Sequence, residues 1–300
     1  MRVLVAGREG QLARALLARL PRDGHQVIAL EPPALDLTRR DSVTRAVAEA
    51  APELVVNAAA YTAVDRAEAE PELARAVNAT GAGWLAAAAA EHGAPVLHVS
   101  TDYVFDGRKG APYAEADAPA PLSVYGATKA EGERLVLAAN PRAAILRTAW
   151  VCGPDGANFL KTMLRLAAER AELRVVADQL GAPTFADDLA ETIARMAPRL
   201  AAAPEGDPAF GLFHLSGAPH TSWHGFAEAI LVGLAERGRK VPRLVAIGTA
   251  DYSTPARRPA DGRLDCGRIA RIHGIAAPDW RAGLARSLDI LVGPREEGRA

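Results

Sequence analysis

The sequence is poor in the features that mark several classes of protein. Its 300 residues include only two cysteines, Cys152 and Cys266, too few and too far apart for a disulfide framework or a metal site. No apolar run is as long as a membrane span, and the N-terminal stretch MRVLVAGREG lacks the apolar region and cleavage site of a signal peptide. The net charge is −1, without blocks of like charge. We therefore expect a cytoplasmic protein with no nucleic-acid or membrane partner.

Hydrophobic residues make up 49% of the chain, enough for a sizeable core, and their pattern in the first half is regular. Short apolar runs alternate with longer helical patterns. The runs are residues 2–6, 26–30, 53–57, 95–100 and 143–148, and the helical patterns are residues 10–20, 41–50, 72–93 and 123–140. Runs that are apolar throughout fit strands covered on both faces. The alternation predicts an α/β fold with a doubly wound parallel sheet of the Rossmann type.

The second half is less regular. Amphipathic helices are expected over residues 158–171, 185–197 and 222–238, and short strands over 173–178, 211–217 and 244–248. The stretch YSTPARRPADGRLDC, residues 252–266, is rich in turn residues and predicts a surface loop. We expect an NAD(P)-binding Rossmann domain over residues 1–150. Residues 151–300 would form a smaller α/β substrate lobe, with some segments returning to the first domain.

A glycine-rich turn follows the first strand. Gly7, Gly10 and Ala13 give G-x-x-G-x-x-A between a strand and a helix, where backbone can approach a pyrophosphate at the helix N-terminus. Glu31 ends the second strand, where a carboxylate reaches the adenosine ribose and favours NADH. Arg8, Arg39 or Arg40 could instead meet the 2′-phosphate of NADPH. The sequence leaves the choice between NADPH and NADH open.

Two further strand ends carry small or hydroxylated residues. After the third strand, Asn57 and three alanines leave room for a flat cofactor against backbone, the alternative being a tightly packed helix–strand contact. The fourth strand ends in Ser100, Thr101 and Asp102, at the edge where open α/β sheets bind ligands. Thr101 could donate a hydrogen bond to a carbonyl oxygen, or cap a turn. We expect His98, inside this strand, to be a packed core residue.

Tyr125 and Lys129 lie four residues apart in LSVYGATKAEGERL, on one face of a predicted helix that begins near Leu122. An ammonium near the phenol would lower the Tyr pKa, and such a phenol can protonate an alkoxide. Tyr-x-x-x-Lys also arises by chance. However, the glycine-rich turn, the alanines after the third strand and the hydroxylated end of the fourth strand come before it in the expected order. This context favours a catalytic role for Tyr125 and Lys129.

These motifs resemble those of extended short-chain dehydrogenases/reductases and, more narrowly, the dTDP-4-dehydrorhamnose reductase family. The likeness spans nearly the whole chain, and its most specific segments are NFLKTML, DQLGAPT and TPARRP. The resemblance implies that NADPH or NADH reduces C4 of a dTDP-linked 4-keto-6-deoxy sugar. It also implies a monomer or homodimer.

The resemblance carries roles over to matching positions. The implied catalytic set is Thr101, Tyr125 and Lys129. The implied cofactor contacts are Gly7, Gly10, Gln11, Leu12, Glu31, Asp36, Leu37, Ala59, Ala60, Tyr61, Tyr125 and Lys129. The implied substrate contacts are Thr101, Asp102, Trp150, Asn158, Arg257 and Arg258, the two arginines suiting a pyrophosphate.

Three positions depart from the family pattern. Ala13 replaces the usual third glycine, which only close helix packing requires. Tyr61 stands where histidine is also expected. Ala15 lacks a carboxylate where some relatives clamp magnesium between subunits, so we expect no metal. Two other functions stay open: a reductase of another nucleotide-linked 4-keto sugar, and a non-catalytic regulatory subunit with this fold, like that of methionine adenosyltransferase.

Overall fold

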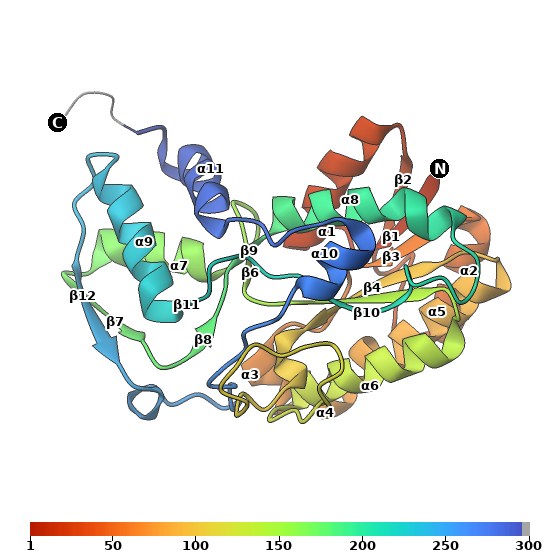
Figure 1. Ribbon diagram of the computed structural model, residues 1–300, viewed down its shortest axis with the longest axis horizontal. Helices are drawn as coiled ribbons and strands as arrows, with labels where there is room; N and C mark the ends of the chain where they lie inside the picture. The colour runs from red at the N-terminus through yellow and green to blue at the C-terminus, as the bar shows by residue number, and fades with distance from the viewer. Residues whose placement is uncertain (296–300) are drawn as a thin grey trace.

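In the computed structural model, which describes residues 1–295, six parallel strands form one central sheet (Figure 1). The strand order is β10–β5–β4–β3–β1–β2. The bounds are β1 (Arg2–Ala6), β2 (Gln26–Leu30), β3 (Leu54–Asn57), β4 (Val96–Thr101), β5 (Ala143–Thr148) and β10 (Gly211–His214). The predicted doubly wound parallel sheet is confirmed, and its first five strands match their predicted bounds within one residue.

Helices cover both faces of the sheet. One face carries α1 (Gln11–Arg19), α8 (Ala186–Ala202) and α10 (Gly267–His273), and the other carries α2 (Arg40–Ala50), α5 (Ala82–Glu91) and α6 (Val124–Ala139). Side chains of β1 alternate between the two layers, with Val3 and Val5 in one core cluster and Leu4 and Ala6 in the other. Burial on both faces is why the strand sequences are apolar throughout.

The helix predicted over residues 72–93 is interrupted. It consists of α4 (Pro71–Arg75), a π-helical turn η2 (Ala76–Gly81) and α5, preceded by the short α3 (Val64–Ala67). The turn places Asn78 in contact with the loop after β3, because its side chain accepts from the backbone N–H of Tyr61 at 2.8 Å and donates to the Tyr61 carbonyl at 3.1 Å. Periodicity alone does not predict this local widening of the helix.

A smaller lobe lies beside the sheet, at the left of Figure 1. Its core is built by α7 (Phe159–Glu169), α9 (Trp223–Ala235) and α11 (Trp280–Val292) against the paired strands β7 (Glu172–Val176) and β12 (Arg243–Ile247). Two short pairs connect the lobes: β6 (Val151–Cys152) with β9 (Thr184–Phe185), and β8 (Leu180–Gly181) with antiparallel β11 (Thr221–Ser222). The second half thus contributes the strand β10 to the central sheet and the helices α8 and α10 to one of its covering layers. The domain division at residue 150 stays a prediction.

The predicted surface loop over residues 252–266 is only partly exposed. Tyr252 is exposed, whereas Ala256, Asp261 and Leu264 are buried. The segment crosses between the lobes: the Gly262 N–H donates to the Leu180 carbonyl at 2.8 Å. The prediction of a surface loop is therefore wrong for the buried positions 256, 259, 261, 262 and 264, because turn residues also build irregular packed connections. Among residues 1–295, no helix is both long and apolar enough to cross a membrane.

Candidate active site

A cavity of about 770 Å³ opens at the carboxyl edge of the sheet, among the segments that follow β1 to β5. Ligands of open α/β sheets bind at this edge. Most of the predicted site residues line it. They are Gly7, Gly10, Gln11, Leu12, Glu31, Ala59, Ala60, Thr101, Asp102, Tyr125, Lys129 and Trp150. Residues far apart in the sequence are thus brought together around one space.

The glycine-rich turn forms one end of the cavity. Gly7 has φ +100°, a conformation that residues with side chains rarely adopt, so glycine is favoured there by its backbone conformation. Gly10 is the N-cap of α1, so the first N–H groups of the helix face the cavity without a capping side chain. Glu31 lies alongside, its carboxylate accepting from the Glu9 N–H at 3.3 Å. A helix N-terminus beside bare backbone is suited to a pyrophosphate.

Several predicted residues lie off this lining. Asp36 accepts hydrogen bonds from Thr38, which lower the pKa of its carboxyl group, and Leu37 is buried in the core. Tyr61 donates to Glu70 at 2.6 Å. Asn158 caps α7 and donates to the Gln11 side chain at 2.8 Å. It therefore contacts a residue that lines the cavity but does not line the cavity itself. Arg257 is exposed. Direct ligand contacts by these side chains stay predictions.

Thr101 ends β4, and Tyr125 and Lys129 project from the first turns of α6 toward it. Ser123 caps this helix by accepting from the Gly126 N–H at 3.2 Å, so α6 begins at Val124, two residues after the expected start near Leu122. The Thr101 hydroxyl donates to Asp102 at 3.0 Å. The Lys129 ammonium nitrogen lies 2.6 Å from the Val99 carbonyl oxygen, to which it donates.

The pKa values of this group differ from the expectation. Burial raises the pKa of Tyr125 to about 12, opposed by a hydrogen bond with Thr101, and burial lowers the pKa of Lys129 to about 8. The sequence predicts that Lys129 lowers the pKa of the phenol. In this arrangement it does not. A phenol with a raised pKa is protonated at neutral pH, which is the state that a general acid needs.

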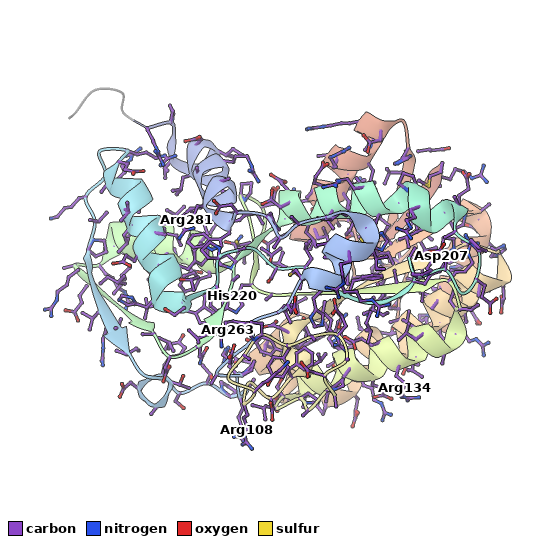
Figure 2. The ribbon with its side chains drawn as sticks, in the orientation of Figure 1. Arg108, Arg134, Asp207, His220, Arg263 and Arg281 are labelled. Atoms are coloured by element: carbon purple, nitrogen blue, oxygen red, sulfur yellow. The ribbon has the colours of Figure 1, made fainter. Side chains whose placement is uncertain are left out.

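Close packing and a buried ion pair fix the position of α6. A Cβ on Gly132 would overlap the Asn78 carbonyl oxygen, so glycine lets the helix lie against η2. Glu133 binds Arg147 of β5 through two hydrogen bonds of 2.8 and 2.6 Å, with both side chains almost wholly buried. Arg134, the next residue, projects from the exposed face of α6 (Figure 2). The inward face of α6 is thus held to β5 and η2 while its outward face is solvated.

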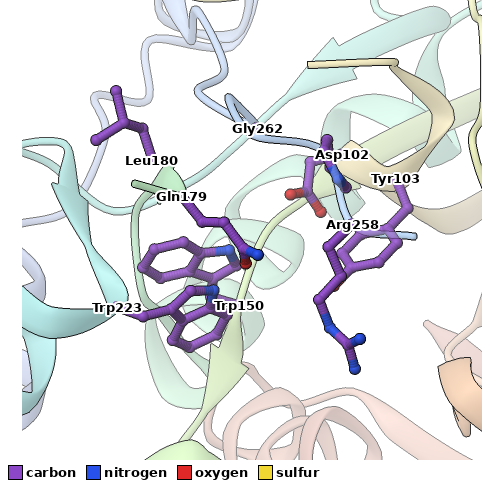
Figure 3. A pocket seen from close by; sticks show the side chains of 9 residues that line it. Asp102, Tyr103, Trp150, Gln179, Leu180, Trp223, Arg258 and Gly262 are labelled. Atoms are coloured by element: carbon purple, nitrogen blue, oxygen red, sulfur yellow. The ribbon is translucent and has the colours of Figure 1, made fainter. Parts of the chain in front are cut away.

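A second, narrow pocket adjoins the cavity (Figure 3). The stacked indoles of Trp150 and Trp223, 3.6 Å apart between ring centroids, lie on one side, and Asp102 and Arg258 lie on the other. Trp150 has φ +47°, and a Cβ on Gly181 would press into its ring. An indole held in this strained conformation is fixed by its surroundings, as is common at binding sites.

Several lining residues do not follow from the sequence motifs. Tyr103, Gln179 and Trp223 line this pocket, and Tyr103 and Trp223 also line the larger cavity. Tyr103 meets Tyr125 edge to face, with ring centroids 5.6 Å apart. The sequence does contain a signal for Tyr103, because this residue directly follows Thr101 and Asp102. Gln179 and Trp223 stand in patterns that only predict a strand end and a helix start.

Asp102 should make stability depend on pH. Burial raises the pKa of this carboxyl from 3.8 to about 7, so between these values the folded chain keeps a proton that the unfolded chain releases. The free energy of unfolding therefore falls as the pH rises through this window. Asp102→Asn should remove about 2 kcal/mol of that fall between pH 5 and pH 7, measured by urea denaturation of both proteins. Parallel pH profiles would contradict a buried, protonated Asp102.

Comparisons with known proteins match nearly the whole chain. A family model described as "RmlD substrate binding domain" matches residues 1–292. The dTDP-4-dehydrorhamnose reductase of Sinorhizobium fredii (strain NBRC 101917 / NGR234) is 47% identical over 293 residues, 97% of this chain and 98% of that protein. The enzyme of the same name from Escherichia coli (strain K12) is 40% identical over 297 residues, 97% of this chain and 98% of that protein.

Solved structures give the same result. A dTDP-4-dehydrorhamnose reductase from Clostridium acetobutylicum ATCC 824 superposes with a TM-score of 0.90 at 37% identity, covering 97% of this chain and 99% of that one. The enzyme of the same name from Bacillus anthracis str. Ames, solved in complex with NADP, gives a TM-score of 0.86 at 35% identity, covering 96% of this chain and 98% of that one.

Proposed function

The chain belongs to the dTDP-4-dehydrorhamnose reductase family, and from this premise we propose that it reduces the C4 ketone of dTDP-4-dehydro-L-rhamnose to give dTDP-L-rhamnose. It is an NAD(P)H-dependent oxidoreductase that acts on a nucleotide sugar. One observation carries the finer proposal: the large cavity lined by the glycine-rich turn and the narrow pocket lined by the two indoles, here called the tryptophan pocket, are joined. They share the lining residues Asp102, Tyr103, Trp150 and Trp223, and Thr101 and Tyr125 line the large cavity beside them.

The residues present fit a nicotinamide cofactor. Gly7 and Gly10 leave backbone bare beside the N-terminus of α1, and Glu31 stands at the end of β2 for the adenosine ribose. Ala59 and Ala60 line the cavity with small side chains, and Lys129 lines the same cavity, where it would hold the nicotinamide ribose. When bound, the cofactor supplies a hydride to the ketone carbon.

Tyr125 acts as the general acid in this proposal. Its phenolic O–H bond breaks as the ketone oxygen gains negative charge, and the proton passes to that oxygen to form the alcohol. In the complex the Thr101 hydroxyl turns from Asp102, to which it donates at 3.0 Å, and donates its one hydrogen to the same oxygen, which stabilises the developing charge. Solvent then returns a proton to the phenolate. Asp102 and Trp150 hold the deoxysugar against these groups.

The direct test is cofactor consumption. Purified protein is mixed with dTDP-4-dehydro-L-rhamnose and either NADPH or NADH, and the product is identified by chromatography. Oxidation with formation of dTDP-L-rhamnose supports the proposal and gives the cofactor preference. Oxidation only with another nucleotide-linked 4-keto sugar would change the substrate. Cofactor binding without oxidation across a panel of such sugars would favour a regulatory subunit.

Arg258 is proposed to contact the substrate diphosphate. It lines the tryptophan pocket and is held by Asp65 at 2.8 Å. Arg258→Met should raise KM for the sugar nucleotide about 10-fold or more with a smaller effect on kcat, since a hydrogen bond to a charged group is worth about 1.5–3 kcal/mol. Arg281→Met, exposed and outside both cavities, is the matched control. An equal rise in KM for Asp65→Asn, which keeps the guanidinium, would assign the effect to loop structure instead.

A further inference from the structure

The side-chain amide of Gln179 is bonded at one end only. Gln179 follows β7 and Thr249 follows β12, the parallel strand paired with it, so the two residues lie at the same edge. Gln179 Nε2 donates to the Thr249 hydroxyl at 3.1 Å, and this hydroxyl donates to Asp178 Oδ1 at 2.7 Å. Among residues 1–295, no donor forms a hydrogen bond with Gln179 Oε1. The amide carbonyl is therefore a free acceptor.

The charge of Asp178 decides which amide atom faces Thr249. Hydrogen bonds from the backbone N–H and the hydroxyl of Thr249 lower the pKa of the Asp178 carboxyl, so this group is ionised at neutral pH and can only accept. The single hydrogen of the Thr249 hydroxyl is used for Asp178. The amide atom of Gln179 that faces this hydroxyl must therefore be the Nε2 donor, which leaves Oε1 as the atom without a partner.

The free acceptor belongs to the tryptophan pocket. Gln179 is 6% exposed and lines this pocket, and its amide end is directed into it (Figure 3). The next residue, Leu180, is fixed by the segment that crosses between the lobes. Its N–H donates to the Ala260 carbonyl and its carbonyl accepts from the Gly262 N–H, both at 2.8 Å. A buried acceptor without a partner costs free energy, which a ligand that supplies a donor recovers.

The pocket suits the hydroxyl-bearing edge of a sugar ring. The stacked indoles of Trp150 and Trp223 offer apolar surface for C–H groups, and Gln179 and Asp102 place polar atoms beside them. Because the pocket is narrow and joins the large cavity, a ring can lie at the junction with its ketone beside Tyr125 and one edge in the pocket. A donor on that edge would meet Gln179 Oε1.

We propose that Gln179 is a specificity-determining residue whose Oε1 accepts a hydrogen bond from the C2 or C3 hydroxyl of the sugar. This inference rests on the proposed function, since it takes the ligand to be a 4-keto-6-deoxy sugar, in which these two carbons carry the ring hydroxyls. Thr249 and Asp178 fix the orientation of the amide, so the site presents an acceptor before the sugar binds. A site built to accept from a hydroxyl rejects analogues that lack it.

Binding of the reaction product measures this contact without turnover. Isothermal titration calorimetry gives the affinity of the full chain for dTDP-L-rhamnose and for dTDP, with reduced cofactor present, which cannot react with an alcohol. We expect Gln179→Met to weaken binding of dTDP-L-rhamnose about 10-fold and to leave binding of dTDP unchanged. Gln26→Met, at an exposed residue outside both cavities, is the matched control. An unchanged affinity for dTDP-L-rhamnose, or an equal loss for both ligands, would overturn the proposal.

Product analogues test the same contact in the unsubstituted protein. The 2-deoxy and 3-deoxy analogues of dTDP-L-rhamnose each lack one ring hydroxyl. We expect one of them to bind about 10-fold more weakly than dTDP-L-rhamnose, and this difference to disappear in Gln179→Met. Equal affinities of the unsubstituted protein for all three sugars would contradict the proposal, even if Gln179→Met failed to fold. No binding of dTDP-L-rhamnose by the unsubstituted protein would overturn the proposed function, and this inference with it.

Discussion

Tyr125→Phe is expected to lower kcat by about 10²- to 10⁴-fold, the range that a positioned general acid contributes. The phenol is buried and lines the cavity beside Thr101, and its raised pKa keeps it protonated. Phenylalanine keeps the ring and its edge-to-face contact with Tyr103 but has no proton to give. Cofactor affinity should change little, because the ring still fills the same space. Steady-state oxidation of NADPH or NADH and a fluorescence titration of cofactor binding measure the two quantities.

Tyr252→Phe is the matched control, since Tyr252 is 56% exposed and outside the cavity lining. It should leave both kcat and cofactor affinity unchanged. Near-normal turnover in Tyr125→Phe would remove Tyr125 as the acid. A parallel loss of cofactor binding would instead show that the hydroxyl group serves mainly to hold the cofactor.

Much of this site follows from local sequence. Apolar runs predict the strands, and the carboxyl ends of parallel strands lie at one edge of the sheet. Gly7 follows β1 and Thr101 ends β4 at this edge, and Lys129 of α6 lines the same cavity. Tyr125 and Lys129 share a face because both lie on one helix. These predictions need only periodicity and strand order, which is why they transfer directly to the structure.

The rest depends on contacts between distant segments. The Trp150–Trp223 stack joins the end of β5 to the start of α9, and nothing near either residue indicates the other. β10 comes from the less regular second half, yet it pairs with β5 at the edge of the sheet. His98 was expected in the core and is buried there, but its link to Lys129 depends on the packing of α6 against β4. Sequence spacing carries no information on such packing.

Glu133→Ala is expected to lower the free energy of unfolding by about 3–5 kcal/mol, the cost of leaving one partner of a buried ion pair uncompensated. Arg147 is 1% exposed, and Glu133 is its bidentate partner. Its remaining Nη1 hydrogen bond runs to His214 at 3.3 Å, which does not neutralise the charge. Denaturant unfolding, with the slope checked against the unsubstituted protein, measures the loss.

Glu131→Ala is the matched control, because Glu131 is also on α6 and also pairs with an arginine, Arg75, at 2.7 Å. That arginine side chain is 61% exposed, so the expected loss is at most about 1 kcal/mol. Combining Glu133→Leu with Arg147→Met should cost less than Glu133→Ala alone, because no charge is then left buried. Equal losses at positions 131 and 133 would show that α6 is held by its apolar packing and glycine contacts rather than by this ion pair.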